Sequence, residues 1–197
     1  MVLGGALSDG GGLYNLIRDS LLYGDDSQTI EDELASLQPD CHGLTVLPFW
    51  MGERSTGWNP NARGGVFGMT LTTRPIEILR AAMEAVAYRF ALVANELDPF
   101  APGARVVASG NALRFSPTWT QIVADVLGRP LVLSHRNEAS TRGAALLALE
   151  AAGKIDNISD FPVSAATTFE PDMSCHERYR EGLKRQQHLY NQVFRKT

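Results

Sequence analysis

The sequence predicts an α/β fold with a mostly parallel sheet and helices on both of its faces. Two patterns support this prediction. Short apolar segments, typical of buried strands, alternate with longer segments whose apolar residues recur every three or four positions, as on one face of a helix. Glycine or proline stands at most of the changeovers, where chain direction has to change. With 197 residues, 44% of them hydrophobic, the chain is long enough to bury the core of one domain.

Composition excludes several classes of function. A net charge of −4, without any basic run interleaved with aromatic residues, argues against DNA or RNA binding. No apolar run approaches the roughly 20 residues that span a bilayer, and no signal peptide opens the sequence. Cys41 and Cys175 lack a Cys-x-x-Cys partner, which favours reduced thiols in a cytoplasmic protein. Each cysteine is followed by a histidine, and these four residues could in principle hold one metal ion. The polar, connector-like sequence around both pairs argues against such a site.

The first part of the chain predicts a strand, a glycine turn and two helices. Residues 1–7 are expected to form a short strand, and a helix follows the turn at 8–12 up to about Leu22. That turn is either a phosphate cradle or a tight structural turn. The second is favoured, because the full Gly-x-x-x-x-Gly-Lys pattern is absent. Residues 24–42 are acidic and are expected to include a helix with a solvated face.

The next part predicts two short strands that flank a long loop. Residues 44–49 are apolar and indicate a buried strand. Loop 50–63 carries aromatic and charged residues, which fit either a ligand cleft or an ordered loop held by Glu53 with Arg54 or Arg63. The ordered loop is favoured.

A strand with three glycines leads into the clearest helix of the sequence. Glycines at positions 64, 65 and 68 indicate tight turns or close backbone approach. Pro75 suits the first turn of a helix, where its missing N–H costs nothing. Spacings of three and four predict the buried face of this helix: Leu79, Ala82, Met83, Val86, Phe90, Val93 and Leu97.

After a stop at 98–103, residues 105–109 predict another short strand. Gly110, Asn111 and Ala112 follow at its carboxyl end, where open α/β sheets place their ligands. Ser116 is then expected to cap a helix that begins with Pro117 and ends at Gly128.

The remainder predicts one strand, two helices and a connector. Residues 131–133 form the strand, and helix 138–152 carries small residues, Ala144, Ala145 and Ala148, that would permit close packing. Residues 156–173 are expected to be irregular. The final helix, 174–194, has this predicted buried stripe: Tyr179, Leu183, Leu189, Tyr190 and Val193.

Four segments, in order, resemble motifs of the FGGY family of carbohydrate kinases. They are Leu-Pro-Phe-Trp-Met-Gly-Glu-Arg-Ser at 47–55, the glycine-rich stretch and Glu-Ile-Leu-Arg-Ala-Ala-Met-Glu within 64–84, Ala-Ser-Gly-Asn-Ala at 108–112 together with residues 113–128, and Glu-Ala-Ser-Thr-Arg-Gly-Ala-Ala at 138–145. A Rossmann dehydrogenase is excluded, because no strand is followed by Gly-x-Gly-x-x-Gly and a downstream acid.

The resemblance implies one lobe of the ribonuclease H-like, actin-type ATPase fold, incomplete at its N-terminal end. Residues 1–155 would be a partial C-terminal, nucleotide-binding lobe, and 156–197 the connector and last helix of the same domain. The implied reaction transfers the γ-phosphate of ATP, with Mg²⁺, to a hydroxyl of a sugar or sugar acid, as in gluconate and xylulose kinases. Which sugar is accepted is not encoded in these residues.

By this resemblance, adenosine would bind at Ser109, Gly110, Asn111 and Ala112; the family commonly has a second glycine where this sequence has Asn111. A plain strand-to-helix turn is the alternative. No residue of this sequence matches the family's catalytic aspartate or its phosphate turns, so no catalytic or metal residue is assigned. By the resemblance, the catalytic base is expected in an N-terminal lobe and the phosphate turns upstream of this sequence. A non-catalytic nucleotide-binding or interaction module is the competing hypothesis, and a homodimer is left open.

The implied fold also places two further strands between the strand at residues 2–3 and that at 105–109. Without them, unpaired backbone groups and apolar faces would be exposed. The expected outcomes are completion by an upstream polypeptide, displacement of the first strand, or association into a loosely packed state.

Overall fold

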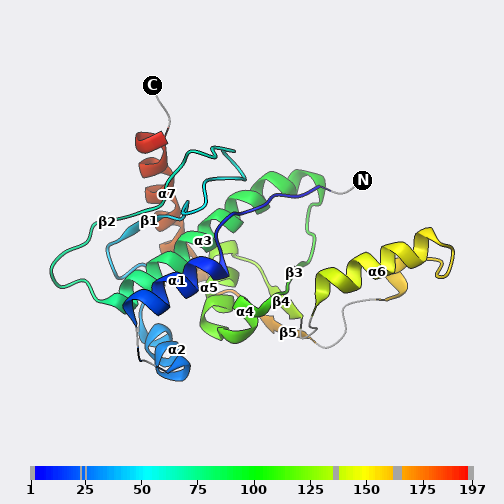
Figure 1. Cartoon of the computed structure of the whole chain (residues 1–197), viewed down its shortest axis with the longest axis horizontal. Helices are drawn as coiled ribbons and strands as arrows, with labels where there is room; N and C mark the ends of the chain where they lie inside the picture. The colour runs from blue at the N-terminus through cyan, green and yellow to red at the C-terminus, as the bar shows by residue number, and fades with distance from the viewer. Residues whose placement is uncertain (1–2, 23, 25, 135–137, 162–165, 195–197) are drawn as a thin grey trace.

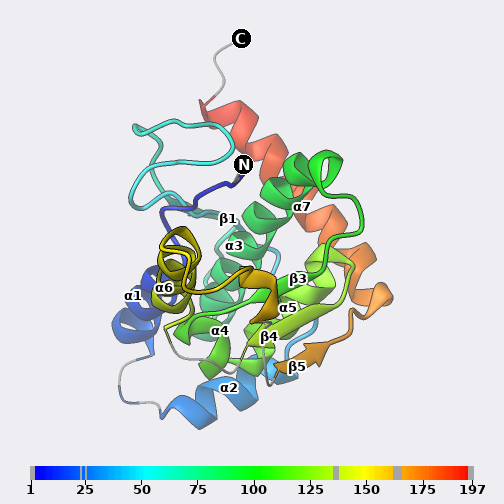
Figure 2. The ribbon, with the colours of Figure 1, turned by 90° about the vertical axis from the view of Figure 1, so that its right-hand side faces the viewer.

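The structure, a computed structural model, describes residues 3–22, 24, 26–134, 138–161 and 166–194. Figures 1 and 2 show its elements from two directions. The helices are α1 (Gly11–Leu21), α2 (Ser27–Ser36), α3 (Pro75–Leu97), α4 (Asn111–Phe115), α5 (Pro117–Leu127), α6 (Ala139–Ala151) and α7 (Met173–Phe194), with 3₁₀ turns η1 (Asp98–Phe100) and η2 (Ile158–Asp160). The strands are β1 (Thr45–Leu47), β2 (Gly65–Phe67), β3 (Val106–Ala108), β4 (Leu131–Ser134) and β5 (Ala166–Phe169).

The described strands form two small sheets. β1 and β2 pair antiparallel, whereas β3, β4 and β5 form a second sheet in which β3–β4 is parallel and β4–β5 antiparallel. The prediction of a mostly parallel sheet is therefore wrong for this part of the chain. A parallel pair needs a helical crossover, which α4 and α5 supply between β3 and β4; the loop from β1 to β2 contains no helix and returns the chain antiparallel.

Helix α3 is the centre of the core. It crosses the middle of the molecule (Figure 1), and it is buried on nearly all sides from Ile76 to Arg89 because α1, α5, α7 and β1 pack around it. The predicted stripe is confirmed at Leu79, Ala82, Met83 and Val86. It is wrong at Phe90, whose side chain is exposed although its neighbours Arg89 and Ala91 are buried.

The predicted strand at residues 1–7 is wrong for residues 3–7, which lie outside both sheets; Met1 and Val2 are not among the described residues. Instead, this segment contacts the loop after β1. The Ala6 N–H donates to the Ser55 hydroxyl over 2.8 Å, and the Ser55 N–H donates to the Ala6 carbonyl over 2.9 Å. These bonds satisfy backbone groups that a neighbouring strand would otherwise engage.

The glycines around β2 occupy positions where a side chain would collide with its neighbours. A Cβ on Gly64 would overlap the Trp50 ring, and a Cβ on Gly68, which has φ +90°, would lie 2.7 Å from the Gly43 carbonyl oxygen. The prediction of close approach is confirmed at both positions.

Loop 50–63 is ordered, as predicted, but through other partners. The buried Glu53 carboxylate accepts a hydrogen bond from Arg89 of α3 over 2.5 Å and one from the Tyr190 hydroxyl of α7 over 2.6 Å. Arg54 is exposed, and Arg63 donates to the carbonyls of Pro60 and Ala62. The predicted pairs with Arg54 and Arg63 are therefore wrong.

The C-terminal third departs from prediction at three places. Residues 166–169 form the edge strand β5 instead of irregular chain. Helix α6 has no buried residue and projects from the body of the molecule (Figure 1), so the expected close packing of its alanines is not found. In α7, Tyr179 is buried as predicted, but Val193 is exposed, and Phe194 packs near Phe49 in its place. No helix in the described ranges is long and apolar enough to cross a membrane.

Gly182 marks a close contact between α7 and α3. A Cβ at this position would overlap the Tyr88 hydroxyl oxygen, and both residues are buried. We expect Gly182→Ala to destabilise the fold by about 1–3 kcal/mol through overpacking. The matched control is Gly143→Ala in α6, where a Cβ meets nothing within 4 Å; there alanine should stabilise by up to about 1 kcal/mol. Thermal unfolding of both variants tests this, and equal shifts would contradict it.

Candidate functional site

The predicted site residues follow β3 directly. Gly110 has φ +113° and ψ 153°, backbone angles that favour glycine, and it is the N-cap of the short helix α4. Ser109, Gly110 and Asn111 are exposed, and Ala112 is half-buried. A Cβ on Gly110 would meet nothing within 4 Å, so the turn presents bare backbone to open space.

A cavity of about 350 Å³ lies between this turn and the first two helices. Its volume is within the range of small-molecule sites, about 300–1,000 Å³. It is lined by Gly11, Tyr14, Asn15, Arg18, Ser27, Glu31, Asn111, Ala112, Phe115 and Ser116. The two glycine-containing turns, about 100 residues apart in the sequence, meet here: a Cβ on Gly11 would lie 3.1 Å from the Ala112 Cβ.

The four predicted residues are divided between two cavities. Asn111 and Ala112 line the larger one, whereas Ser109, Gly110 and Asn111 line a neighbouring hollow of about 220 Å³ together with Arg114 and the start of α6. Asn111 therefore borders both. Residues 138–140, which begin the last family-like motif of the sequence, also line this second hollow.

Tyr14 lines the larger cavity, and the buried Trp119 supports its ring. Their rings stack with centroids 5.7 Å apart, and the Arg18 guanidinium lies 5.7 Å from the Tyr14 centroid. The Trp119 indole N–H donates to the Met83 carbonyl over 3.0 Å, which fixes this ring to α3. Burial raises the pKa of the Tyr14 hydroxyl, and the nearby Glu31 carboxylate raises it further, so this hydroxyl stays protonated at neutral pH.

Glu31 is the acidic side chain among the described residues that line this cavity. One carboxylate oxygen accepts from the Thr118 N–H over 2.7 Å, and the other accepts from the Ser116 hydroxyl over 2.9 Å. The acidic stretch 24–42 predicts a largely solvated helix face, and Glu31 departs from this, because it is half-buried and bonded to the start of α5. The sequence patterns did not indicate three residues that line this cavity, Tyr14, Arg18 and Glu31. Only the neighbouring glycine turn has a pattern typical of a ligand site.

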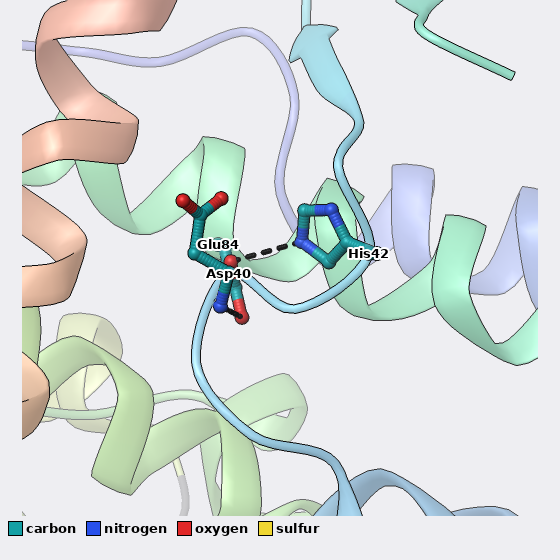
Figure 3. Close-up of side chains that lie close together, drawn as sticks. All are labelled: Asp40, His42 and Glu84. Atoms are coloured by element: carbon teal, nitrogen blue, oxygen red, sulfur yellow. Dashed lines mark hydrogen bonds and ion pairs between the residues drawn. The ribbon is translucent and has the colours of Figure 1, made fainter.

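A second polar cluster, Asp40, His42 and Glu84, has the residue types of a metal site (Figure 3). Its atoms are already engaged by the protein. Glu84 accepts from Arg80 over 2.8 Å and from His42 Nε2 over 3.0 Å, while His42 Nδ1 accepts the Leu44 N–H over 3.0 Å. Asp40 pairs with Arg185 over 2.5 Å. We therefore assign this cluster a structural role in joining α3, α7 and the segment before β1.

The two Cys-His pairs do not form a shared site in the described structure. His42 faces Glu84, whereas His176 Nδ1 bonds the Asp125 carbonyl over 2.8 Å at the end of α5. Neither cysteine belongs to the acidic cluster around Glu84.

Comparisons with known proteins point to one family. Residues 3–152 match the model of the FGGY family of carbohydrate kinases, C-terminal domain. The chain is 31% identical over 195 residues to a gluconokinase of Bacillus licheniformis, covering 91% of this chain and 38% of that protein. It is 34% identical over 180 residues to a glycerol kinase of Koribacter versatilis, covering 89% of this chain and 36% of that protein.

Solved structures show the same fold. A xylulose kinase from Rhodospirillum rubrum matches with a TM-score of 0.80 and 26% identity over 95% of this chain and 38% of its own. A gluconate kinase from Lactobacillus acidophilus matches with a TM-score of 0.83 and 24% identity over 96% of this chain and 39% of its own. The chain thus spans less than two fifths of the length of these relatives, and its fold is a partial ribonuclease H-like, actin-type ATPase lobe.

Proposed function

Because this chain belongs to the FGGY family of carbohydrate kinases, we propose that it is the nucleotide-binding part of an enzyme that transfers the γ-phosphate of ATP to a hydroxyl of a sugar or sugar acid. The observation that carries this proposal is the cavity of about 350 Å³ between α1 and α4. It is lined by Asn111 and Ala112 of the predicted adenosine turn, by Gly11 of a second glycine turn and by the Tyr14 ring. Gluconate and xylulose are the substrates we propose to test first.

The residues around the cavity fit the adenosine end of ATP. Ala112 and Gly11 approach so closely that larger side chains would narrow the cavity. Gly110, which lines the neighbouring hollow, presents bare backbone in a conformation that favours glycine. Tyr14 and Phe115 offer aromatic surface to a purine, Phe115 being largely exposed at the rim. We propose Ser109, Gly110, Asn111 and Ala112 as the adenosine-binding turn, with α1 as the opposite wall.

The remaining catalytic parts are proposed to come from an N-terminal lobe. Phosphoryl transfer needs a carboxylate base for the sugar hydroxyl, phosphate-binding turns and Mg²⁺ to offset charge on the phosphates. Two surfaces support such a partner: α6 has no buried residue, and β3 pairs, among the described strands, with β4 on one side. We propose that residues 1–155 and 156–197 form one domain, because α7 packs against α5, α3 and β1, and that the kinase is cytoplasmic.

Replacing Gly110 tests the adenosine turn. We expect Gly110→Val to abolish measurable ADP binding by this chain, because valine strains a backbone at φ +113° and puts its side chain into the space beside the turn. Isothermal calorimetry measures the effect. Gly103→Val is the matched control, since Gly103 also has positive φ, +70°, with open space around it, but lies away from both cavities. ADP binding that survives in Gly110→Val, or is lost equally in both variants, would contradict the assignment.

A further inference from the structure

The Glu31 carboxylate lies at the wall of the proposed nucleotide cavity, and two hydrogen bonds fix its position. The Thr118 N–H and the Ser116 hydroxyl each donate to one of its oxygens, over 2.7 and 2.9 Å. Ser116 is itself fixed, because its hydroxyl oxygen accepts the Trp119 N–H over 3.1 Å as the N-cap of α5. The carboxylate is therefore preorganised before any ligand arrives.

The two bonds leave acceptor capacity on Glu31. An ionised carboxylate offers about four lone-pair sites, and the protein donors occupy two of them. Glu31 is half-buried and lines the cavity, so the remaining capacity is available to a ligand there. The two protein bonds also place this carboxylate at the N-terminus of α5, where a negative charge is stabilised. They use only part of its acceptor capacity.

Charge decides which end of a nucleotide can lie against Glu31. A carboxylate repels phosphates and accepts from hydrogen-bond donors, so it suits the base or the ribose hydroxyls. The aromatic side chains that line the cavity favour the base: Tyr14 lies there with Glu31, and Phe115 is exposed. Of the parts of adenine, the 6-amino group is the donor.

We propose that Glu31 is a specificity-determining residue that accepts a hydrogen bond from the 6-amino group of adenine. This inference rests on the proposed function, because it assumes that the cavity takes a nucleotide. By this inference, a side chain of α2 recognises the adenine base, whereas the turn at 109–112 contacts the adenosine through its backbone. Adenine is then preferred over purines without a donor at position 6.

The test compares ADP with purine riboside 5′-diphosphate, which lacks the 6-amino group, by calorimetry on the full chain. A hydrogen bond to a charged group is worth enough for the parent chain to bind ADP at least about tenfold more tightly. In Glu31→Ala this preference should disappear through weaker ADP binding. Glu31→Gln, which keeps side-chain volume and one acceptor, should show a reduced preference and serves if the alanine variant does not fold.

Matched controls separate the outcomes. Glu33→Ala removes the same charge from the same helix at a side chain that pairs with Arg74 and does not line the cavity, so it should keep the full preference. Equal binding of ADP and the purine analogue by the parent chain, or an unchanged preference in both Glu31 variants, overturns the inference and leaves the proposed nucleotide site intact. If the parent chain binds 2′- or 3′-deoxy-ADP more weakly than ADP and Glu31→Ala removes that difference, the inference is also overturned, because Glu31 then contacts a ribose hydroxyl instead of the base. No binding of either nucleotide overturns the site and the inference together.

Discussion

The 197-residue chain by itself is expected to show no sugar-dependent turnover of ATP. Kinases of this kind turn over at about 1–100 s⁻¹. Loss of the base alone costs about 10²–10⁴-fold, and missing electrostatic support for the phosphates costs about a further 10²–10³-fold. Because neither set of residues is found in this sequence, we expect turnover at least about 10⁴-fold below that range. A coupled assay of ADP release with gluconate, xylulose and glycerol measures it.

The decisive comparison adds the proposed N-terminal lobe. The chain spans 38% of the Bacillus licheniformis gluconokinase, so the part of that enzyme preceding the matched region can be fused to it or supplied separately. Sugar-dependent turnover should appear in the combined protein, and Gly110→Val should reduce it. Turnover at an ordinary kinase rate by the chain alone would refute the expected division of the site. A combined protein that folds and binds ADP without turnover would favour the non-catalytic module.

Removing the Glu84 carboxylate is expected to have the largest effect on stability. Its side chain is 1% exposed and accepts hydrogen bonds from Arg80, His42, the Asp40 N–H and Tyr88. Breaking a buried ion pair by deleting one partner costs about 3–5 kcal/mol, since it leaves the other charge buried. We expect a loss of this size in Glu84→Ala, measured by urea or thermal unfolding.

A surface ion pair provides the control for Glu84. Glu181 pairs with Lys184 on α7, and both side chains are largely exposed. Glu181→Ala should therefore leave the unfolding transition nearly unchanged. Similar losses in the two variants would contradict a structural role for the buried network.

The same carboxylate should make stability fall in acid. Burial pushes the pKa of Glu84 up, but the hydrogen bond from His42 and the charge and hydrogen bond of Arg80 outweigh it, and the net pKa is lowered. A lowered folded-state pKa stabilises the fold above the unfolded value, near 4.3, and that stabilisation is lost as pH falls through the folded-state pKa. Below about pH 4 the parent chain should therefore lose stability more steeply than Glu84→Gln. Parallel pH profiles would contradict this.

Local sequence signals predicted the individual elements well where a helix or turn carries its own stop and start signals. Ser116 caps α5 through the Trp119 N–H, Pro117 begins it, and Gly128 ends it with φ +63°. These effects act within one turn of helix, so they are readable from neighbouring residues. The same holds for Pro75 at the start of α3 and for the glycine turn before α4.

The candidate site was predictable only on one side. The turn at 109–112 follows a strand, which is a local pattern, and the resemblance to a family gave it a role. The opposite wall, with Tyr14, Arg18 and Glu31, comes from α1 and α2, about 80–100 residues earlier in the chain. No periodicity joins these segments, and the helix carrying Glu31 resembled an ordinary solvated helix.

By itself, the sequence determined the α/β character of the chain, most helix and strand positions, the glycines that allow close approach and the family. The tertiary structure decided which partners the buried charges found: Arg89 for Glu53, and His42 and Arg80 for Glu84. It also placed residues 3–7 outside the sheet and β5 at its edge. Capping and periodicity act between residues a few positions apart. Strand pairing and buried ion pairs depend on segments tens of residues apart, and their energies exist only once the chain has brought those segments together.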